Sequence, residues 1–395
     1  MKFKKPDEFK QLMESNIWKY YIYNFFFLFV LFEPILFVYF QKNLSFTLTQ
    51  VMIAVSFFTI LTGILEIPTG VVGDKLGYKK TLLLSAFVML IGSIGYAISQ
   101  NFYHILISEF FWAFGFSFAS GTQDAFIYDS LKNLKREKEY NKVNGRATAI
   151  FWSGLAISSI TGGLLAKVNL GLPVYIGFIP LIIPFFIVLT FIEPKRERKE
   201  LSHSEHIIES FKYTFKHTKL RFILFYFIMI ALILESSSKF FQPFMNQAGI
   251  NIALFGFIYS FGYLISGAGS LFSHKIEDYL KEEKLLYFIY IATFLTLLFL
   301  SIFSSIIVII GILILLLIDG IQGPIMAGYL NRNIESYNRA TVNSISSLIK
   351  KISLAIMLPI LGYIGQSFNI NKVFLINSII IILSFIIIKS WYKRI

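Results

Sequence analysis

The chain consists mainly of long apolar runs that short polar connections separate. An apolar run of about twenty residues is long enough to cross a bilayer as a helix, and hydrocarbon forbids backbone groups without hydrogen-bond partners. The pattern therefore predicts an all-α integral membrane protein with twelve transmembrane helices. The predicted spans cover residues 17–40, 48–73, 79–99, 102–131, 143–167, 171–193, 220–246, 251–273, 284–304, 306–330, 341–366 and 371–392.

One hydrophilic connection is much longer than the others and divides the spans six and six. It runs from Glu193 to Lys219, and apolar residues recur within it at about helical spacing, at Leu201, Ile208, Phe211 and Phe215. This spacing predicts an amphipathic helix on the inner leaflet. We therefore expect an N-terminal six-helix bundle over 1–193, a cytosolic linker over 194–219 and a C-terminal six-helix bundle over 220–395.

Basic residues are distributed unequally between the two sides of the predicted helices. One side carries only Lys42, Lys167 and Lys372, whereas the other carries the basic residues at 75–80, 132–146, 195–221, 275–284, 332–339 and 393–394. This asymmetry predicts that both termini lie in the cytosol. It also accounts for the formal net charge of +13 without a nucleic-acid partner, because no clustered basic face or base-reading motif occurs.

Composition excludes several classes of protein. With 395 residues, 56% hydrophobic and 15% charged, and a mean hydropathy of +0.68, the chain is too apolar for a soluble fold. It has no cysteine, which excludes disulfides, thiolate metal sites and a cysteine nucleophile. It also lacks a His-Glu-x-x-His, a Gly-x-Ser-x-Gly elbow and a nucleotide loop, so we expect no enzyme activity, no metal, no cofactor and no direct use of ATP. The abundance of Lys, Ile and Phe suggests an AT-rich bacterial genome and hence a location in the cytoplasmic membrane.

The connection between the second and third predicted helices carries the most specific motif. It reads Gly70-Val-Val-Gly-Asp74-Lys75-Leu-Gly77-Tyr78-Lys79-Lys80. This pattern, Gly-x-x-x-Asp-Lys-x-Gly-x-Lys-Lys, resembles the corresponding loop of the major facilitator superfamily. The resemblance implies two pseudo-symmetric six-helix bundles, transport of a small molecule by alternating access, and a monomer surrounded by membrane lipid.

The resemblance also assigns a gating role to residues at the cytosolic side. It implies that Asp74 meets the start of the eleventh helix, near Ala340 and Thr341, and that helix end carries partial positive charge. Tyr78 stands where the family usually has a second basic residue. The predicted gating set is Gly70, Asp74, Lys75, Gly77, Lys79, Glu66, Asp124, Asp129, Arg146 and Arg339, with Asp124 and Asp129 as partners for Lys75 or Lys79. The alternative for the lysines is a purely topological role.

An Arg-Ala-Thr repeat supports a duplication of two six-helix halves. It opens the predicted fifth helix at Arg146-Ala147-Thr148 and the predicted eleventh helix at Arg339-Ala340-Thr341.

Charged residues within the spans are functional candidates, because hydrocarbon solvates them poorly. Carboxyl groups in such places can carry protons, and the predicted coupling residues are Glu33, Glu235, Asp319 and Glu109. Glu33 is preferred because Lys239 lies one turn from Glu235 and should hold it ionised. The alternatives are a hydrogen-bonded polar role for Glu33 and a neutralising Glu235–Lys239 pair without a role in transport. Lys350 and Lys351 either balance such acids or extend toward the interface.

Polar and aromatic residues on the same helices predict a substrate cavity. In the superfamily, helices 1, 4, 7 and 10 line the central cavity. Spacing of i, i+4, i+7 and i+11 places Glu235, Lys239, Gln242 and Asn246 on one helical face. The predicted cavity residues are Tyr23, Asn24, Trp112, Gln123, Lys239, Gln242, Asn246, Gln322 and Met326.

The fifth predicted helix bears on the direction of transport. Its sequence Gly154-Leu-Ala-Ile-Ser158-Ser159-Ile-Thr-Gly162-Gly163 resembles the Gly-x-x-x-Gly-Pro-x-x-Gly-Gly pattern of drug/proton antiporters. Phe111 stands where those antiporters usually carry an arginine. The expected function is proton-coupled export of small amphipathic or lipophilic compounds. Two alternatives stay open: a proton symporter that imports a small polar solute such as a sugar or metabolite, and an intramembrane enzyme or sensor.

Overall fold

The computed structural model describes residues 6–195, 218–280, 282–334 and 339–392, and every regular element within them is helical. This confirms the predicted all-α class. Most of the predicted linker, with its amphipathic helix, lies outside the described residues, so the predicted boundaries of the two bundles stay a prediction. The chain divides into two compact units.

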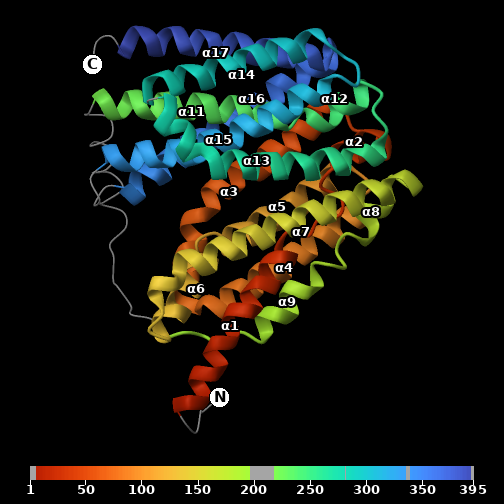
Figure 1. Ribbon diagram of the computed structural model, residues 1–395. Coiled ribbons are helices and arrows are strands. Elements are labelled where there is room, and N and C mark those ends of the chain that lie inside the picture. Colours follow the sequence, from red (N-terminus) through yellow and green to blue (C-terminus); the bar gives the residue numbers. More distant parts are fainter. Residues whose placement is uncertain (1–5, 196–217, 281, 335–338, 393–395) are drawn as a thin grey trace. The chain divides into compact units, whose positions relative to one another are not determined.

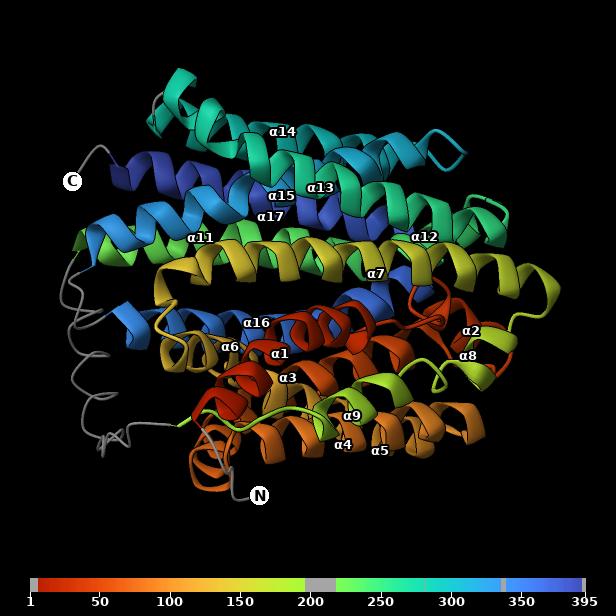
Figure 2. The ribbon, with the colours of Figure 1, turned by 60° about the horizontal axis from the view of Figure 1, so that its bottom comes forward.

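Unit 1 comprises Met1–Leu44, Phe57–Lys199 and Ile252–Ser260. Within it α4 packs along α5 (Figure 2), and α1 packs against α7 and α9. Its elements are α1 (Pro6–Phe27), α2 (Leu36–Lys42), α3 (Leu48–Leu76, whose first residues belong to unit 2), α4 (Tyr78–Ile98), α5 (Phe102–Ala119), α6 (Thr122–Asn133), the 3-10 turn η1 (Glu137–Glu139), α7 (Tyr140–Val168), α8 (Leu172–Ile176) and α9 (Ile182–Leu189).

Unit 2 comprises Ser45–Ser56, Glu200–Asn251 and Phe261–Ile395. Within it α14 runs beside α17 (Figure 1), and α11 packs against α15, α16 and α17. Its helices are α11 (Thr218–Ser238), α12 (Phe241–Gln247), α13 (Ile252–Leu280, whose first residues belong to unit 1), α14 (Glu282–Ile302), α15 (Val308–Asn333), α16 (Arg339–Ser367) and α17 (Ile370–Tyr392).

Helix lengths repeat between the two halves of the chain. The helices α3, α7, α13 and α16 are each 29 residues long, and they correspond to the second, fifth, eighth and eleventh predicted spans. The Arg-Ala-Thr repeat fits less well. Arg339 begins α16, but Arg146-Ala147-Thr148 lies inside α7, because the polar residues from Tyr140 onward are already helical.

Ten of the described helices are long and apolar enough to cross a membrane. The other two predicted spans, 17–40 and 171–193, are interrupted at residues 28–35 and 177–181. Each interruption contains a proline, Pro34 or Pro180. Proline lacks the N–H that a helix needs and disfavours helical backbone at the preceding residue. Hydropathy alone therefore identified these segments but not their breaks.

The seventh predicted span, 220–246, is also broken. Helix α11 ends at Ser238, residues 239–240 form a turn, and α12 begins at Phe241. Pro243 lies in the first turn of α12, where its missing N–H would have had no helical acceptor. The prediction that Glu235, Lys239, Gln242 and Asn246 share one face of a continuous helix is therefore wrong.

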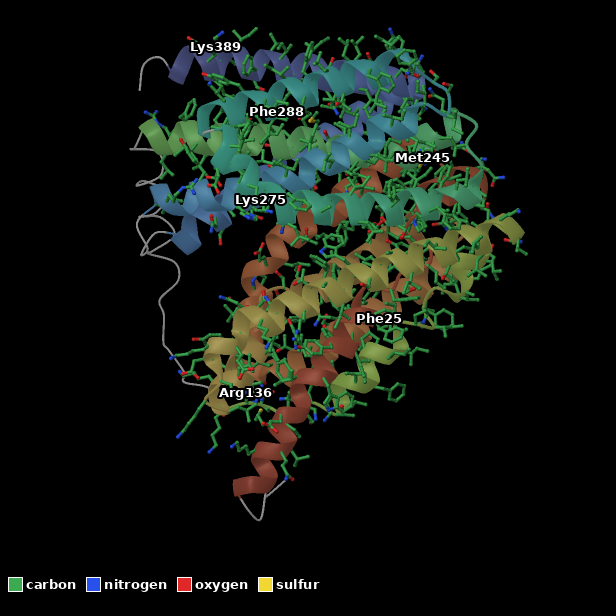
Figure 3. The ribbon with its side chains drawn as sticks, in the orientation of Figure 1. Phe25, Arg136, Met245, Lys275, Phe288 and Lys389 are labelled. Carbon is green, nitrogen blue, oxygen red and sulfur yellow. The ribbon has the colours of Figure 1, made fainter. Side chains whose placement is uncertain are left out.

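Small residues of α7 allow very close packing against α1 and the break that follows it. A methyl group added to Gly154 would overlap the carbonyl oxygen of Phe25, the α1 residue labelled in Figure 3. At Gly162 it would overlap the carbonyl oxygen of Leu31, which lies in the break. Ser158 and Ser159 between them are fully buried. The small-residue pattern of the predicted fifth helix is thus a packing surface.

We predict that Gly162→Ala destabilises the protein by about 1–3 kcal/mol, because the added methyl group must displace backbone rather than a flexible side chain. Gly145→Ala on the same helix is the matched control. Nothing lies within 4 Å of a Cβ there, and exchanging a helical glycine for alanine stabilises by about 0.5–1 kcal/mol. Thermal unfolding in detergent compares the two variants, and equal melting temperatures would contradict the packing argument.

Candidate functional site

A cavity of about 240 Å3 lies within unit 2, where α11, the start of α12, α15 and α16 meet. Its lining combines apolar side chains with two carboxylates, one lysine and two neutral polar groups. The lining residues are Ala231, Leu234, Glu235, Ser238, Phe241, Leu315, Leu316, Asp319, Gln322 and Lys350. Three of the predicted site residues, Glu235, Asp319 and Gln322, therefore come together here.

An ion pair joins two helices across this cavity. Lys350 Nζ of α16 lies 2.8 Å from Glu235 Oε2 of α11, and the two side chains are 32% and 36% exposed. Among the described residues the ion-pair partner of Glu235 is thus Lys350 and not Lys239, which lies in the turn after α11. The alternative of a neutralising Glu235–Lys239 pair is not formed as a direct ion pair, because the helix ends between the two residues, but the charge of Lys239 still acts on Glu235. The sequence did not decide whether Lys350 balances an acid or extends toward the interface. In the structure it pairs with Glu235.

The second acid of the cavity has a different partner. Gln322 Nε2 donates a hydrogen bond to Asp319 Oδ1 over 3.2 Å. The two residues are three apart on α15 and therefore share a face. Within the described part of the chain Asp319 forms no ion pair. The lining thus holds two carboxylates and one lysine, and among the described residues only Glu235 is paired with a cation.

The remaining predicted cavity residues of the second half are not among the residues that line this cavity. Gln242 and Met326 are buried, at 4% and 9% exposure. Asn246 is half-buried on α12, and Lys239 is half-buried in the turn before it. Their contact with a substrate stays a prediction.

The predicted cavity residues of α1 are involved in packing and local hydrogen bonding. Tyr23 is fully buried, with its ring centroid 5.4 Å from that of Phe27 and 5.9 Å from that of Phe191. Asn24 donates a hydrogen bond to the carbonyl of Tyr20 in its own helix, at 2.8 Å. In the structure both side chains belong to the interior of unit 1.

Glu109 and Trp112 of α5 lie in an aromatic cluster of unit 1. Both are buried, at 6% and 7% exposure, and Tyr96 of α4 lies beside Glu109. The Tyr96 and Trp112 rings stack at 6.3 Å, and Phe32 from the break after α1 packs edge-on against Tyr96 at 5.4 Å and Trp112 at 6.0 Å. The Trp112 indole N–H has no hydrogen-bond partner among the described residues. Packing is therefore the role that the contacts of Trp112 show.

Glu33 and Gln123 occupy irregular or half-exposed positions. Glu33, the preferred proton carrier, lies in the break between α1 and α2, half-buried and directly before Pro34. Gln123 is half-buried near the start of α6, which follows a turn at Gly121 with φ of 71°. Both residues belong to unit 1.

The basic motif forms a much tighter connection than the sequence predicts. Residues 70–76 continue α3, and Gly77 alone separates α3 from α4. Gly77 has φ of 95°, a backbone conformation that favours glycine. The backbone of Asp74 therefore lies inside α3 and not beyond its end, and its side chain is outside the described residues. Gly70 has nothing within 4 Å of a Cβ, so packing does not require glycine there.

Hydrogen bonds, rather than lysine ion pairs, hold the start of α4. The Tyr78 hydroxyl donates to Asp129 Oδ2 of α6 at 2.8 Å, so Asp129 has a tyrosine where the sequence predicted Lys75 or Lys79. The backbone N–H groups of Tyr78 and Lys79 donate to the two carboxylate oxygens of Glu193, at 2.8 and 2.7 Å. A carboxylate at a helix N-terminus satisfies free N–H groups and complements the helix dipole. Sequence reasoning missed Glu193, whose place after an apolar span and before Pro194 was the available signal.

The chain after α9 is held by two asparagines in the same manner. Asn16 of α1 accepts from the Ile192 N–H at 3.0 Å and donates to the Ile192 carbonyl at 2.8 Å. Asn133 of α6 exchanges the equivalent pair of bonds with Lys195, at 3.1 and 3.0 Å. Residues 192–195 are thereby tied to three helices of unit 1.

The other predicted gating residues are dispersed over the described surface. Glu66, Lys75 and Arg146 are exposed, and Lys79 is half-buried. Asp124 lies within hydrogen-bonding reach of Asn144 on α7, and the side chain of Arg339 is outside the described residues. Arg136, labelled in Figure 3, pairs instead with Glu139 at 2.7 Å and with Glu14 at 3.4 Å.

Comparison with known proteins decides the family. The family model described as the Major Facilitator Superfamily matches residues 21–353 of the chain. The chain belongs to this superfamily. It is therefore a multi-pass membrane transporter of a small-molecule substrate and not an enzyme.

Individual relatives within the superfamily are distant. The chain is similar to YxaM of Bacillus subtilis (strain 168), an uncharacterized MFS-type transporter, with 24% identity over 362 residues that cover 87% of this chain and 88% of that protein. It resembles the crystal structure of the nucleoside transporter NupG with a TM-score of 0.75 and 14% identity, covering 97% and 99% of the two chains. For an inward-facing, occupied bacterial homologue of the human lysosomal transporter Spinster the TM-score is 0.74 at 11% identity, covering 100% and 98%. These solved structures confirm the predicted superfamily fold. Ten helices in the described residues are long and apolar enough to cross a membrane, and the number of twelve stays a prediction.

We predict that the Glu235–Lys350 ion pair has a coupling energy of about 1–2 kcal/mol, between the values typical of exposed and buried pairs. Glu235→Gln and Lys350→Met should each destabilise the transporter, and the double variant should lose less than the sum of the two. The more exposed pair between Arg332 and Glu277, at 2.6 Å with 53% and 25% exposure, is the matched control. Chemical unfolding in detergent measures both cycles, and a coupling no larger than that of the control would contradict the assignment.

A second prediction concerns the start of α4. Glu193→Ala should destabilise by about 0.5–2 kcal/mol, as the loss of a helix cap does. Glu193→Gln should retain part of this stability, because its amide oxygen still accepts a hydrogen bond. Glu137→Ala, at an exposed position in η1, is the control. Equal unfolding midpoints for Glu193→Ala and Glu137→Ala would show that the capping bonds contribute nothing.

Proposed function

We propose that this transporter exports small amphipathic or lipophilic compounds in exchange for protons, by alternating access. We place it in the bacterial cytoplasmic membrane with both termini in the cytosol, as the distribution of basic residues suggests. The observation that carries the proposal is the cavity of unit 2, in which two carboxylates share one lysine. Asp319 is the residue that we assign to proton exchange, with Glu235 and Lys350 as its charged neighbours.

The charge balance of the cavity supports antiport of substrate and proton rather than symport. Among the residues that line the cavity, Glu235, Asp319 and Lys350 carry charges that sum to one negative charge when all three are ionised, and Lys239 and Lys351 lie near enough to act on Glu235. A proton on Asp319 removes that charge, and so does a positively charged substrate. Because either one neutralises the site and the two compete for the same carboxylate, binding of one favours release of the other. That competition is what an antiporter requires.

The lining supports an amphipathic substrate. Apolar side chains from α11, α12 and α15 surround the charged groups, among them Leu234, Phe241 and Leu315. A compound with an apolar body and one polar or charged end matches such a lining. Its apolar surface is buried there, and none of its polar groups is left without a hydrogen-bond partner. A sugar, with donors and acceptors on every side, matches it less well.

We predict that adding a substrate outside acid-loaded proteoliposomes makes their interior more alkaline, because the substrate enters as protons leave. A panel of lipophilic cations and neutral lipophilic compounds serves as probes, and an internal pH dye reports the proton. Asp319→Asn should slow this proton movement by about tenfold or more, because an amide does not take up the exchanged proton. Substrate-for-substrate exchange by the same variant should persist.

Controls separate this proposal from its alternatives. Protein-free liposomes report passive entry, and Glu137→Gln tests an exposed acid outside the cavity. Glu33→Gln tests the carrier that the sequence favoured. Acidification of the interior on addition of a sugar, metabolite or nucleoside would instead establish a proton symporter and overturn the export proposal.

A further inference from the structure

One group in the cavity of unit 2 is not used by proton exchange. Gln322 is 7% exposed and lines the cavity. Its Nε2 donates to Asp319, but its Oε1 is buried and accepts no hydrogen bond from any group in the described part of the chain. A buried acceptor without a protein donor is costly and marks a place where another molecule donates.

The orientation of the amide follows from its neighbour. Rotating the Gln322 amide by half a turn would place its oxygen against a carboxylate oxygen of Asp319, where two acceptors repel each other. The Nε2–Asp319 bond therefore holds Oε1 as the group that remains for a ligand. Because Asp319 and Gln322 lie three residues apart on α15, one donor-bearing atom can approach both.

The charges of the site limit which ligand can donate a hydrogen bond to Gln322 Oε1. Its lysine is engaged with Glu235 at 2.8 Å, so the groups that remain for a ligand at this end are acceptors, the Gln322 carbonyl and the Asp319 carboxylate. A ligand that suits them brings positive charge together with at least one N–H. A quaternary ammonium brings the charge but has no proton to donate.

Building on the proposed export function, we infer that the substrates are protonated amines with at least one N–H, recognised through Gln322 Oε1 and Asp319. Their apolar part lies against side chains such as Leu234 and Phe241. The cavity of about 240 Å3 is smaller than the roughly 300–1,000 Å3 of sites for drug-sized ligands. It therefore takes a small amine, or the amine end of a larger one.

The test compares N,N-dimethylbenzylamine with benzyltrimethylammonium, a pair that differs by one methyl group in place of the N–H. Binding is measured by calorimetry on the purified full-length protein in detergent, because the neutral amine crosses bilayers without a transporter. We expect the amine to bind about tenfold more tightly, the factor that one charge-assisted hydrogen bond provides. Equal or reversed affinities would overturn the inference.

Variants of Gln322 provide the second readout. Gln322→Leu should weaken binding of the amine by about tenfold and leave the quaternary ion nearly unchanged, whereas Gln322→Asn, which keeps an amide, should retain part of the preference. The exposed Gln100→Leu is the control, and unfolding midpoints show whether each variant is folded. If Gln322→Leu weakens both ligands equally, Gln322 has only a packing role and the inference fails.

Failure of the amine inference can be distinguished from failure of the proposed export function. If the two compounds bind equally and each drives proton exchange in proteoliposomes beyond the protein-free control, export stands and the inference falls. If the amine is preferred through Gln322 but moves no protons beyond the protein-free control, recognition stands and antiport falls.

Discussion

A charge inside a bilayer must be neutralised by another part of the protein, and this requirement organises unit 2. Hydrocarbon offers neither counter-ions nor hydrogen bonds, so each buried ionic group needs a partner from a neighbouring helix. Glu235 of α11 finds Lys350 of α16, and this pair joins two helices that no short loop connects. Asp319 on α15 shares the cavity without a cation of its own among the described residues. In the proposed exchange, the surplus acid, rather than the ion pair, is the group that responds to protons and cations.

The same solvent limits where the backbone departs from a helix. The breaks in the first and sixth spans contain a proline, whereas the fourth span is broken at Ser120 and Gly121. Hydrocarbon cannot satisfy the loose backbone groups of a break, so protein has to cover them. Leu31 in the first break has its carbonyl against Gly162 of α7, a contact that only glycine permits. Phe32 from the same break packs on Tyr96 and Trp112. The break is therefore part of the packed interior of unit 1, held by α7 on one side and aromatic rings on the other.

Much of the fold follows from the sequence, but which charged residues pair with each other does not. Hydropathy identified all ten helices of the described residues that are long and apolar enough to cross a membrane, because span length is fixed by bilayer thickness. It missed the end of α11 before Lys239, since turns of a few residues leave average hydropathy unchanged. It also paired Glu235 with Lys239, because spacing along one helix says nothing about a facing helix. The sequence predicted Glu235 and Asp319 as coupling residues and Gln322 as a cavity residue, and the structure brings all three to one cavity. The ion pair with Lys350, in contrast, depends on how α11 and α16 are rotated toward each other.

The placement of these interactions within single units has a mechanical consequence. Alternating access requires two bundles to move relative to each other, so contacts between bundles break in every cycle. The Glu235–Lys350 pair and the Asp319–Gln322 bond lie within unit 2, and the Glu193 cap of α4 lies within unit 1. Such interactions survive a rigid movement of either unit. In the proposed exchange, the charged cavity then keeps its composition throughout the cycle, and what changes is the side of the membrane from which a proton or a cation would reach it.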